Sequence, residues 1–140
     1  MKKLHKGFTL IELMVVIAVI GLLAAIGIPN YKDYVMRGKI AEATSGLSDG
    51  RIKMEQYFQD NRTYNNTLSP ATAPASTSNF TFSINGPTAS TYTISAVGTG
   101  TMAGFTFTID QNNSKQTTAV QTGWGTPPIT CWVTKKGGGC

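Results

Sequence analysis

The sequence predicts an α+β protein in which one long N-terminal helix packs on an antiparallel sheet of about four strands and a disulfide closes the C-terminal loop. Three observations support this fold class. Residues 8–28 form an apolar run of 21 residues with a single charge. Apolar residues then continue at helical spacing to about Asn61. Three later segments alternate apolar and hydroxyl side chains, as half-buried strands do.

The first seven residues form a basic leader. It contains Lys2, Lys3 and Lys6, which account for part of the formal net charge of +5. Without these lysines, nine basic and seven acidic side chains remain, and a net charge of +2 is not by itself typical of a nucleic-acid-binding protein. Because lysine is enriched on the cytoplasmic side of membrane spans, we expect the leader to stay in the cytoplasm and the rest of the chain to face the periplasm or the exterior.

The apolar run has the length of a membrane-spanning helix. Its 21 residues would extend for about 30 Å, the thickness of a bilayer's hydrocarbon core. Glu12 is its only charge, and an acid at the bilayer centre costs about 2.5–3.5 kcal/mol, so such residues are usually functional. Two simpler interpretations compete with a functional span: a secretory signal peptide cleaved near Ala24 and Ala25, and a plain transmembrane anchor.

Gly21, Gly27 and Pro29 weaken the second half of this apolar helix, because proline lacks an amide donor and glycine has a low helix propensity. They indicate close packing of helices, a segment that bends or unwinds in a filament, or both. From Asn30 to about Asn61 the helix is amphipathic. Its apolar stripe consists of Ile40, Ala43, Leu47, Met54 and Tyr57.

The remainder of the chain predicts an antiparallel sheet. Residues 64–79 form a loop rich in Asn, Pro, Ala, Thr and Ser, which is either a contact surface or a solvated connection. Strands are expected at 80–84, 92–96 and 105–109, with a fourth at 115–120. We expect the apolar face of this sheet to cover the helix stripe. The domain organisation is therefore a leader (1–7), an apolar helix (8–29) and a globular domain (30–140).

The C-terminal segment carries both cysteines, Cys131 and Cys140. An even pair in an exported, membrane-tethered chain indicates a disulfide and an oxidising compartment. Lys135 and Lys136 lie close to Trp132 in the sequence and form a small basic and aromatic patch. This patch is either a solvated turn or a contact for DNA.

Several function classes are excluded by what the sequence lacks. The only histidine is His5, in the leader, so the processed chain could hold neither a Ser-His-Asp or Cys-His site nor a histidine-ligated metal. Asp110, Asn112 and Asn113 resemble part of a calcium loop, but the other carboxylates of such a site are missing and a hairpin turn is favoured. We expect no enzymatic activity, no cofactor and no metal.

The residues Gly7-Phe8-Thr9-Leu10-Ile11-Glu12-Leu13-Met14 resemble the prepilin motif of type IV pilins and the related pseudopilins. The resemblance extends through Pro29-Asn30-Tyr31 and the segment 34–43, and it includes the two C-terminal cysteines. The segments 37–43 and 131–132 are most similar to the PilE-like minor pilins. Residues 64–125 carry no motif of the family.

The resemblance implies a specific maturation and assembly. A prepilin peptidase would cut between Gly7 and Phe8 and N-methylate Phe8. Glu12 would then pair with the N-terminal amine of a neighbouring subunit, and the segment around Pro29 would take part in filament assembly. The implied partners are other pilins, the peptidase, membrane lipid, and the inner-membrane assembly platform with its ATPase. The implied location is the inner membrane for the precursor and an extracellular pilus afterwards.

Two rival functions are consistent with the same sequence. A pseudopilin of a type II secretion system would share the apolar helix, although the C-terminal cysteine pair favours a pilus. A DNA-binding competence pilin would use Lys135, Lys136 and Trp132 as its contact.

Overall fold

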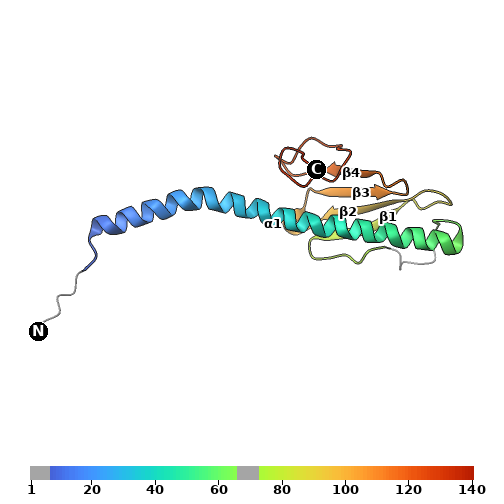
Figure 1. Ribbon diagram of the computed structural model, residues 1–140, viewed down its shortest axis with the longest axis horizontal. Coiled ribbons are helices and arrows are strands. Elements are labelled where there is room, and N and C mark those ends of the chain that lie inside the picture. Colours follow the sequence, from blue (N-terminus) through green and yellow to red (C-terminus); the bar gives the residue numbers. More distant parts are fainter. Residues whose placement is uncertain (1–6, 66–72) are drawn as a thin grey trace, which may run out of the picture. The chain divides into compact units, whose positions relative to one another are not determined.

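The computed structural model describes residues 7–65 and 73–140, so the part of the predicted loop at residues 66–72 lies outside the described residues. The chain divides into two compact units, one reaching to Val35 and the other running from Met36 to Cys140. The helix α1, Leu10–Asn61, belongs to both units (Figure 1). This single helix confirms the predicted long N-terminal helix.

The first unit consists of the N-terminal part of α1. The helix runs through Gly21, Gly27 and Pro29 without interruption. The predicted bending of this segment concerns an assembled filament and stays a prediction. α1 is long and apolar enough to cross a membrane, and its large apolar side chains as far as Ile28 are exposed.

The second unit begins with the amphipathic part of α1. The buried stripe consists of Ile40, Ala43, Leu47, Gly50 and Met54. Tyr57, which the spacing assigns to this stripe, is only half-buried, and its hydroxyl donates to the carbonyl of Asn65 at 3.3 Å. Gly50 replaces it in the buried set because the side chains of Pro74 and Ile94 approach the helix backbone there.

Four strands form an antiparallel sheet in the order β1-β2-β3-β4 (Figure 1), which confirms the predicted number and type. The strands are β1 (Phe80–Asn85), β2 (Thr93–Gly98), β3 (Thr106–Asp110) and β4 (Lys115–Ala119). The turn between β3 and β4 is held by the Asp110 carboxylate, which accepts from the amides of Asn112 and Ser114 at 2.9 and 2.8 Å. This is the predicted hairpin turn.

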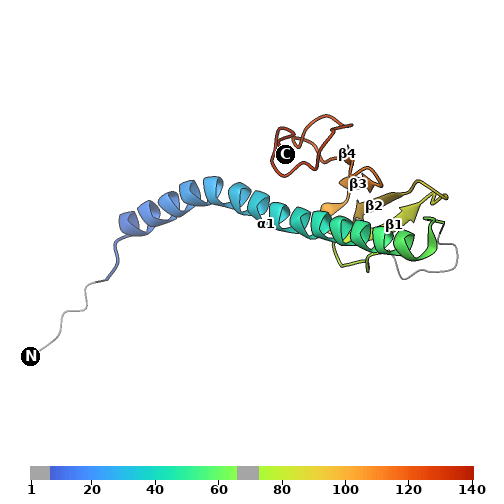
Figure 2. The same cartoon turned by 45° about the vertical axis from the view of Figure 1, so that its right-hand side comes forward.

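The hydrophobic core lies between the buried stripe of α1 and one face of the sheet. The sheet contributes alternate residues such as Phe82, Ile94 and Phe107, and these occur in the predicted period of two. Trp124 and Val133, from the segment beyond β4, complete the core. Figure 2 shows this C-terminal segment beyond β4, at the edge of the sheet opposite β1.

A polar cluster ties the helix to the segments that follow it. The Glu55 carboxylate accepts hydrogen bonds at 3.2 Å from the hydroxyls of Tyr64 and Tyr92. The two phenol rings are 4.7 Å apart, centroid to centroid. Burial, followed by the nearby Glu55 charge, raises the pKa of both tyrosines above the ordinary value. Both phenols therefore remain protonated donors at neutral pH.

Candidate functional site

The N-terminus of α1 is fixed by a reciprocal cap between Thr9 and Glu12. The amide and the hydroxyl of Thr9 donate to Oε2 of Glu12 at 2.9 and 2.8 Å, and the Glu12 amide donates back to the Thr9 hydroxyl at 3.3 Å. This is a capping box, which satisfies helix amides that would otherwise lack a partner. The carboxylate that the sequence singles out is therefore held in one place on the helix.

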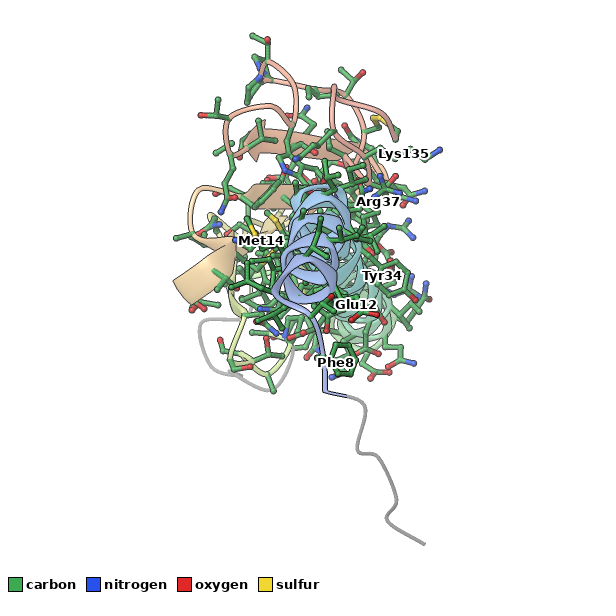
Figure 3. The ribbon with its side chains drawn as sticks, turned by 90° about the vertical axis from the view of Figure 1, so that its left-hand side faces the viewer. Phe8, Glu12, Met14, Tyr34, Arg37 and Lys135 are labelled. Carbon is green, nitrogen blue, oxygen red and sulfur yellow. A yellow bond between two sulfur atoms is a disulfide. The ribbon has the colours of Figure 1, made fainter. Side chains whose placement is uncertain are left out.

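This carboxylate is exposed, and the side chains beside it are apolar. Phe8, Ile11, Val15 and Val16 line the shallow depression that contains Glu12. Phe8 and Glu12 lie on the same side of the helix end, whereas Met14 points to the other side (Figure 3). An ammonium group formed at Phe8 by cleavage would thus lie close to the Glu12 carboxylate, beside apolar side chains.

In the part of the chain that the structure describes, Phe8 and the large apolar side chains of this part of the helix are exposed. Phe8 is 84% exposed, and Leu13 and Ile20 are 60% and 58% exposed. Pro29, for which the resemblance to pilins implies a part in assembly, lies within the same helix. The structure brings Phe8 and Glu12 together and leaves Pro29 more than four helical turns away along the chain.

The C-terminal loop is closed by the predicted disulfide between Cys131 and Cys140. Within the loop, the amides of Thr134 and Lys135 donate to the carbonyl of Gly139 at 2.8 and 3.1 Å. The hydroxyl of Thr117 in β4 donates to the Cys131 carbonyl at 2.6 Å. The loop is thus tied both to itself and to the edge of the sheet.

The predicted basic patch has a further member. The ammonium of Lys115, on β4, lies 4.7 Å from the centroid of the Trp132 ring. Trp132 is only 9% exposed, and its indole nitrogen donates to the Thr108 carbonyl at 2.9 Å. Lys115, Lys135 and Lys136 are exposed, so the accessible chemistry of the patch is cationic more than aromatic.

A shallow groove of about 540 Å³ adjoins this patch. Its residues come from α1 on one side and from β4 and the disulfide loop on the other. They are Thr44, Ser45, Ser48, Lys115, Cys131, Trp132, Thr134 and Cys140. Its hydroxyl groups and its one ammonium are suited to bind a polar or anionic group.

The sequence analysis did not identify the roles of two residues, Thr9 at the helix start and Lys115 beside Trp132. The signal for Thr9 was present, because Thr-x-x-Glu before an apolar run is a capping-box pattern. Lys115 had no local signal, since the hairpin and the loop after β4 bring it to Trp132 from 17 positions earlier in the chain. Within residues 7–65 and 73–140, no group of three or more His, Cys, Asp or Glu side chains is placed to hold a metal ion.

Two family models match adjacent parts of the chain. The prokaryotic N-terminal methylation motif matches residues 2–28. The model described as type IV minor pilin ComP, DNA uptake sequence receptor, matches residues 29–119. The second match covers more than half of the chain and includes the sheet.

Curated relatives and a solved structure agree with these matches. Two type IV major fimbrial proteins FimA of Dichelobacter nodosus are 56% and 54% identical over 61 residues, which is 43% of this chain and 37% and 38% of theirs. The chain thus matches well under half the length of these relatives. The non-core minor pilin PilV of Neisseria meningitidis is 15% identical, with a TM-score of 0.55 over 71% of this chain and 96% of that chain. That likeness shows a shared fold.

Proposed function

The chain belongs to the type IV pilin family, with its globular part matched by the minor pilin model, and on that premise we propose that it is a minor subunit of a type IV pilus. Its role in the filament is structural, and it catalyses no reaction. The observation that carries the proposal is the uncovered apolar helix surface around one capped acid, Glu12. An exposed surface of this kind needs either lipid or other apolar helices to cover it.

Maturation by a prepilin peptidase at the bond between Gly7 and Phe8 fits the local structure. A side chain added at Gly7 would meet no atom within 4 Å among residues 7–65 and 73–140. Glycine at this position is therefore not explained by packing within the chain, and it is consistent with a peptidase that needs close access to the backbone. The same enzyme would N-methylate the new amino group of Phe8.

Assembly would pair Glu12 with the amine of Phe8 in a neighbouring subunit. Oε2 of Glu12 already accepts two hydrogen bonds from Thr9. A carboxylate has about four acceptor positions, so Oε1 keeps the capacity to accept from an ammonium. A lone charge among apolar helices is costly and a hydrogen-bonded pair is much less so, which makes the pairing a means of fixing the axial register between subunits.

The location follows from the two environments that the helix surface can occupy. We place the precursor in the inner membrane with its leader in the cytoplasm, and the mature subunit in an extracellular pilus. Transfer from lipid to the filament replaces one apolar environment by another. The assembly platform and its ATPase are the partners that would drive this transfer.

The proposal is tested by counting subunits in sheared surface fibres from cells that make Glu12→Ala, Glu12→Gln or Leu13→Ala protein. We expect Glu12→Ala to be cleaved and to remain in the membrane, with at least tenfold less protein in the fibres. Leu13→Ala, which removes apolar volume and no charge, should be incorporated. Glu12→Ala protein at the wild-type level in fibres would overturn the assembly mechanism.

A second function, DNA binding, is favoured by the match to the model of the minor pilin ComP, a DNA uptake sequence receptor, and by the cationic patch. Lys115, Lys135 and Lys136 would contact phosphates, and Trp132 would hold Lys115 in place through their cation–π contact. In this arrangement the covered indole contributes position more than base stacking.

A gel shift of the full-length chain in detergent, at several salt concentrations, tests the second function. Neutralising Lys135 and Lys136 should lower the affinity and make the salt dependence shallower by about one unit per lost phosphate contact. Lys53→Ala is the matched control, because Lys53 pairs with Asp49 at 3.0 Å on α1. Absence of binding at low salt, or equal effects of the loop and control variants, would remove DNA binding.

A further inference from the structure

We propose that Tyr31 and Tyr34 lie in the phospholipid headgroup layer on the outer side of the membrane before the subunit is assembled. This inference rests on the proposed membrane-inserted precursor and names the lipid surface that its helix contacts. The partner is the polar layer of a bilayer, with its phosphate and carbonyl groups.

Helix length places the two tyrosines at the right depth. At about 1.5 Å per residue, Tyr31 is about 32 Å from Leu10 along the axis, and Tyr34 is about 36 Å from it. A bilayer has a hydrocarbon core about 30 Å thick and a total thickness of about 40–45 Å. With Leu10 at the inner boundary of the core, both phenols fall just outside its outer boundary.

The two side chains are available for such a contact. Tyr31 is 69% exposed and Tyr34 is 75% exposed. Residues three apart share a helix face, so the two rings and the 56%-exposed side chain of Ile28 form a continuous stripe. The stripe begins in the apolar membrane segment and ends in phenols, which matches the change from hydrocarbon to headgroups.

Their chemistry differs from that of tyrosines used inside the globular unit. Tyr64 and Tyr92 donate to Glu55, and Tyr57 donates to Asn65. A phenol outside such a cluster has an apolar ring and a hydroxyl that seeks water or a headgroup oxygen, and tyrosine is enriched at membrane interfaces for this reason. Lys32, exposed between the two tyrosines, adds an ammonium for lipid phosphates.

Anchoring at this end also sets the depth of Glu12. Tyr31 is nineteen positions after Glu12, which is about 28 Å along the helix. The acid would then lie near the inner boundary of the hydrocarbon core and not at its centre. The insertion cost of a charge falls towards the interface, so the tyrosine stripe would keep Glu12 in a tolerable position until it pairs.

The test uses the full-length chain labelled with 3-fluorotyrosine in nanodiscs of phosphatidylethanolamine and phosphatidylglycerol. Single Tyr→Phe variants assign the fluorine signals. Three relaxation agents are compared: a gadolinium chelate attached to lipid headgroups, a nitroxide at the end of a lipid chain, and a soluble gadolinium chelate. We expect the headgroup agent to broaden the signals of Tyr31 and Tyr34 at least threefold more than that of Tyr57, the control tyrosine on the same helix.

The outcomes separate this inference from the proposed function. Equal broadening of Tyr31, Tyr34 and Tyr57 by the headgroup agent would overturn the inference, as would stronger broadening of the first two by the soluble agent than by the headgroup agent. If the chain-end nitroxide still broadened the methyl signals of the apolar helix in a matched sample with 13C-labelled methyl groups, the membrane-inserted precursor would stand without the tyrosine contact. If no signal responded to either lipid-borne agent, both the inference and the membrane-inserted precursor would fail.

Discussion

Substitution of Gly46 on α1 tests how closely the helix and the sheet approach each other. A Cβ atom at this position would lie 2.5 Å from Cζ and 2.7 Å from Cε1 of Phe82 in β1. Both distances are far below ordinary van der Waals contact, so the ring has to move by about 1 Å within a packed core. Phe82 is only 7% exposed, which leaves it little room to do so.

The magnitude follows from two opposed effects. Overpacking of a core costs about 1–3 kcal/mol. Replacing glycine by alanine within a helix contributes up to about 1 kcal/mol of stability. We therefore expect Gly46→Ala to lower the free energy of unfolding by up to about 2 kcal/mol. Gly38→Ala is the matched control, because a Cβ at Gly38 meets no atom of the described residues within 4 Å, and only the helix gain applies.

The assay is denaturant unfolding of the full-length chain in detergent, followed by the fluorescence of Trp124 and Trp132, which are 1% and 9% exposed. Gly38→Ala should shift the midpoint to higher denaturant, and Gly46→Ala should shift it to lower denaturant. A difference of about 1–3 kcal/mol between the two variants is predicted. Equal stabilisation by both would refute the close approach of α1 and β1.

Three further predictions concern the cap, the tyrosine cluster and the disulfide. Thr9→Ala should weaken the helix start by about 0.5–2 kcal/mol, seen as faster hydrogen exchange of first-turn amides, whereas Thr9→Ser should not; equal exchange in both would contradict the capping box. Because burial raises the pKa of Tyr92 in the folded state, the contribution of this phenol to the free energy of unfolding is complete below pH 10 and is lost at higher pH. When the free energy of unfolding is measured from pH 7 to 11, Tyr92→Phe should therefore show a smaller decrease at the alkaline end than the wild type. An unchanged slope would contradict this. Joint replacement of Cys131 and Cys140 by serine should lower the free energy of unfolding by about 2.7 kcal/mol. A reducing agent should lower the free energy of unfolding of the wild type by the same amount and should leave that of the variant unchanged.

Much of the fold was accessible from the sequence because each element carries a local pattern. The apolar run, the helical spacing through Ile40 and Leu47, and the alternation in the strands each depend on neighbouring residues alone. The two cysteines were predicted to pair because an exported chain with an even number tends to use them. These parts of the prediction are confirmed.

The parts that sequence reasoning missed depend on contacts between distant segments. Gly50 is buried because Pro74 and Ile94 approach it, and nothing near Gly50 in the chain indicates this. The cluster around Glu55 is similar, since Tyr92 comes to the helix from β2, 37 positions later. No pattern near Glu55 indicates that the hydroxyls of Tyr64 and Tyr92 donate to its carboxylate.

The candidate sites show the same difference between local patterns and contacts of distant segments. Phe8 and Glu12 are four positions apart, at the start of α1, so their proximity was accessible once the helix was assigned. The pairing of Lys115 with Trp132 needs the hairpin and the loop beyond β4, and spacing alone does not indicate it. What either site binds depends on other molecules, so the experiments above use fibres, lipid or DNA.

The central claim is that the chain is cut between Gly7 and Phe8 and enters a surface filament through α1, which begins at Leu10. Mass spectrometry of the N-terminal peptide from sheared, washed fibres tests this most directly. We predict a peptide that starts at N-methylated Phe8. Recovery of the protein only as a secreted monomer that begins beyond Ala25, or in fibres with the leader still attached, would contradict the account.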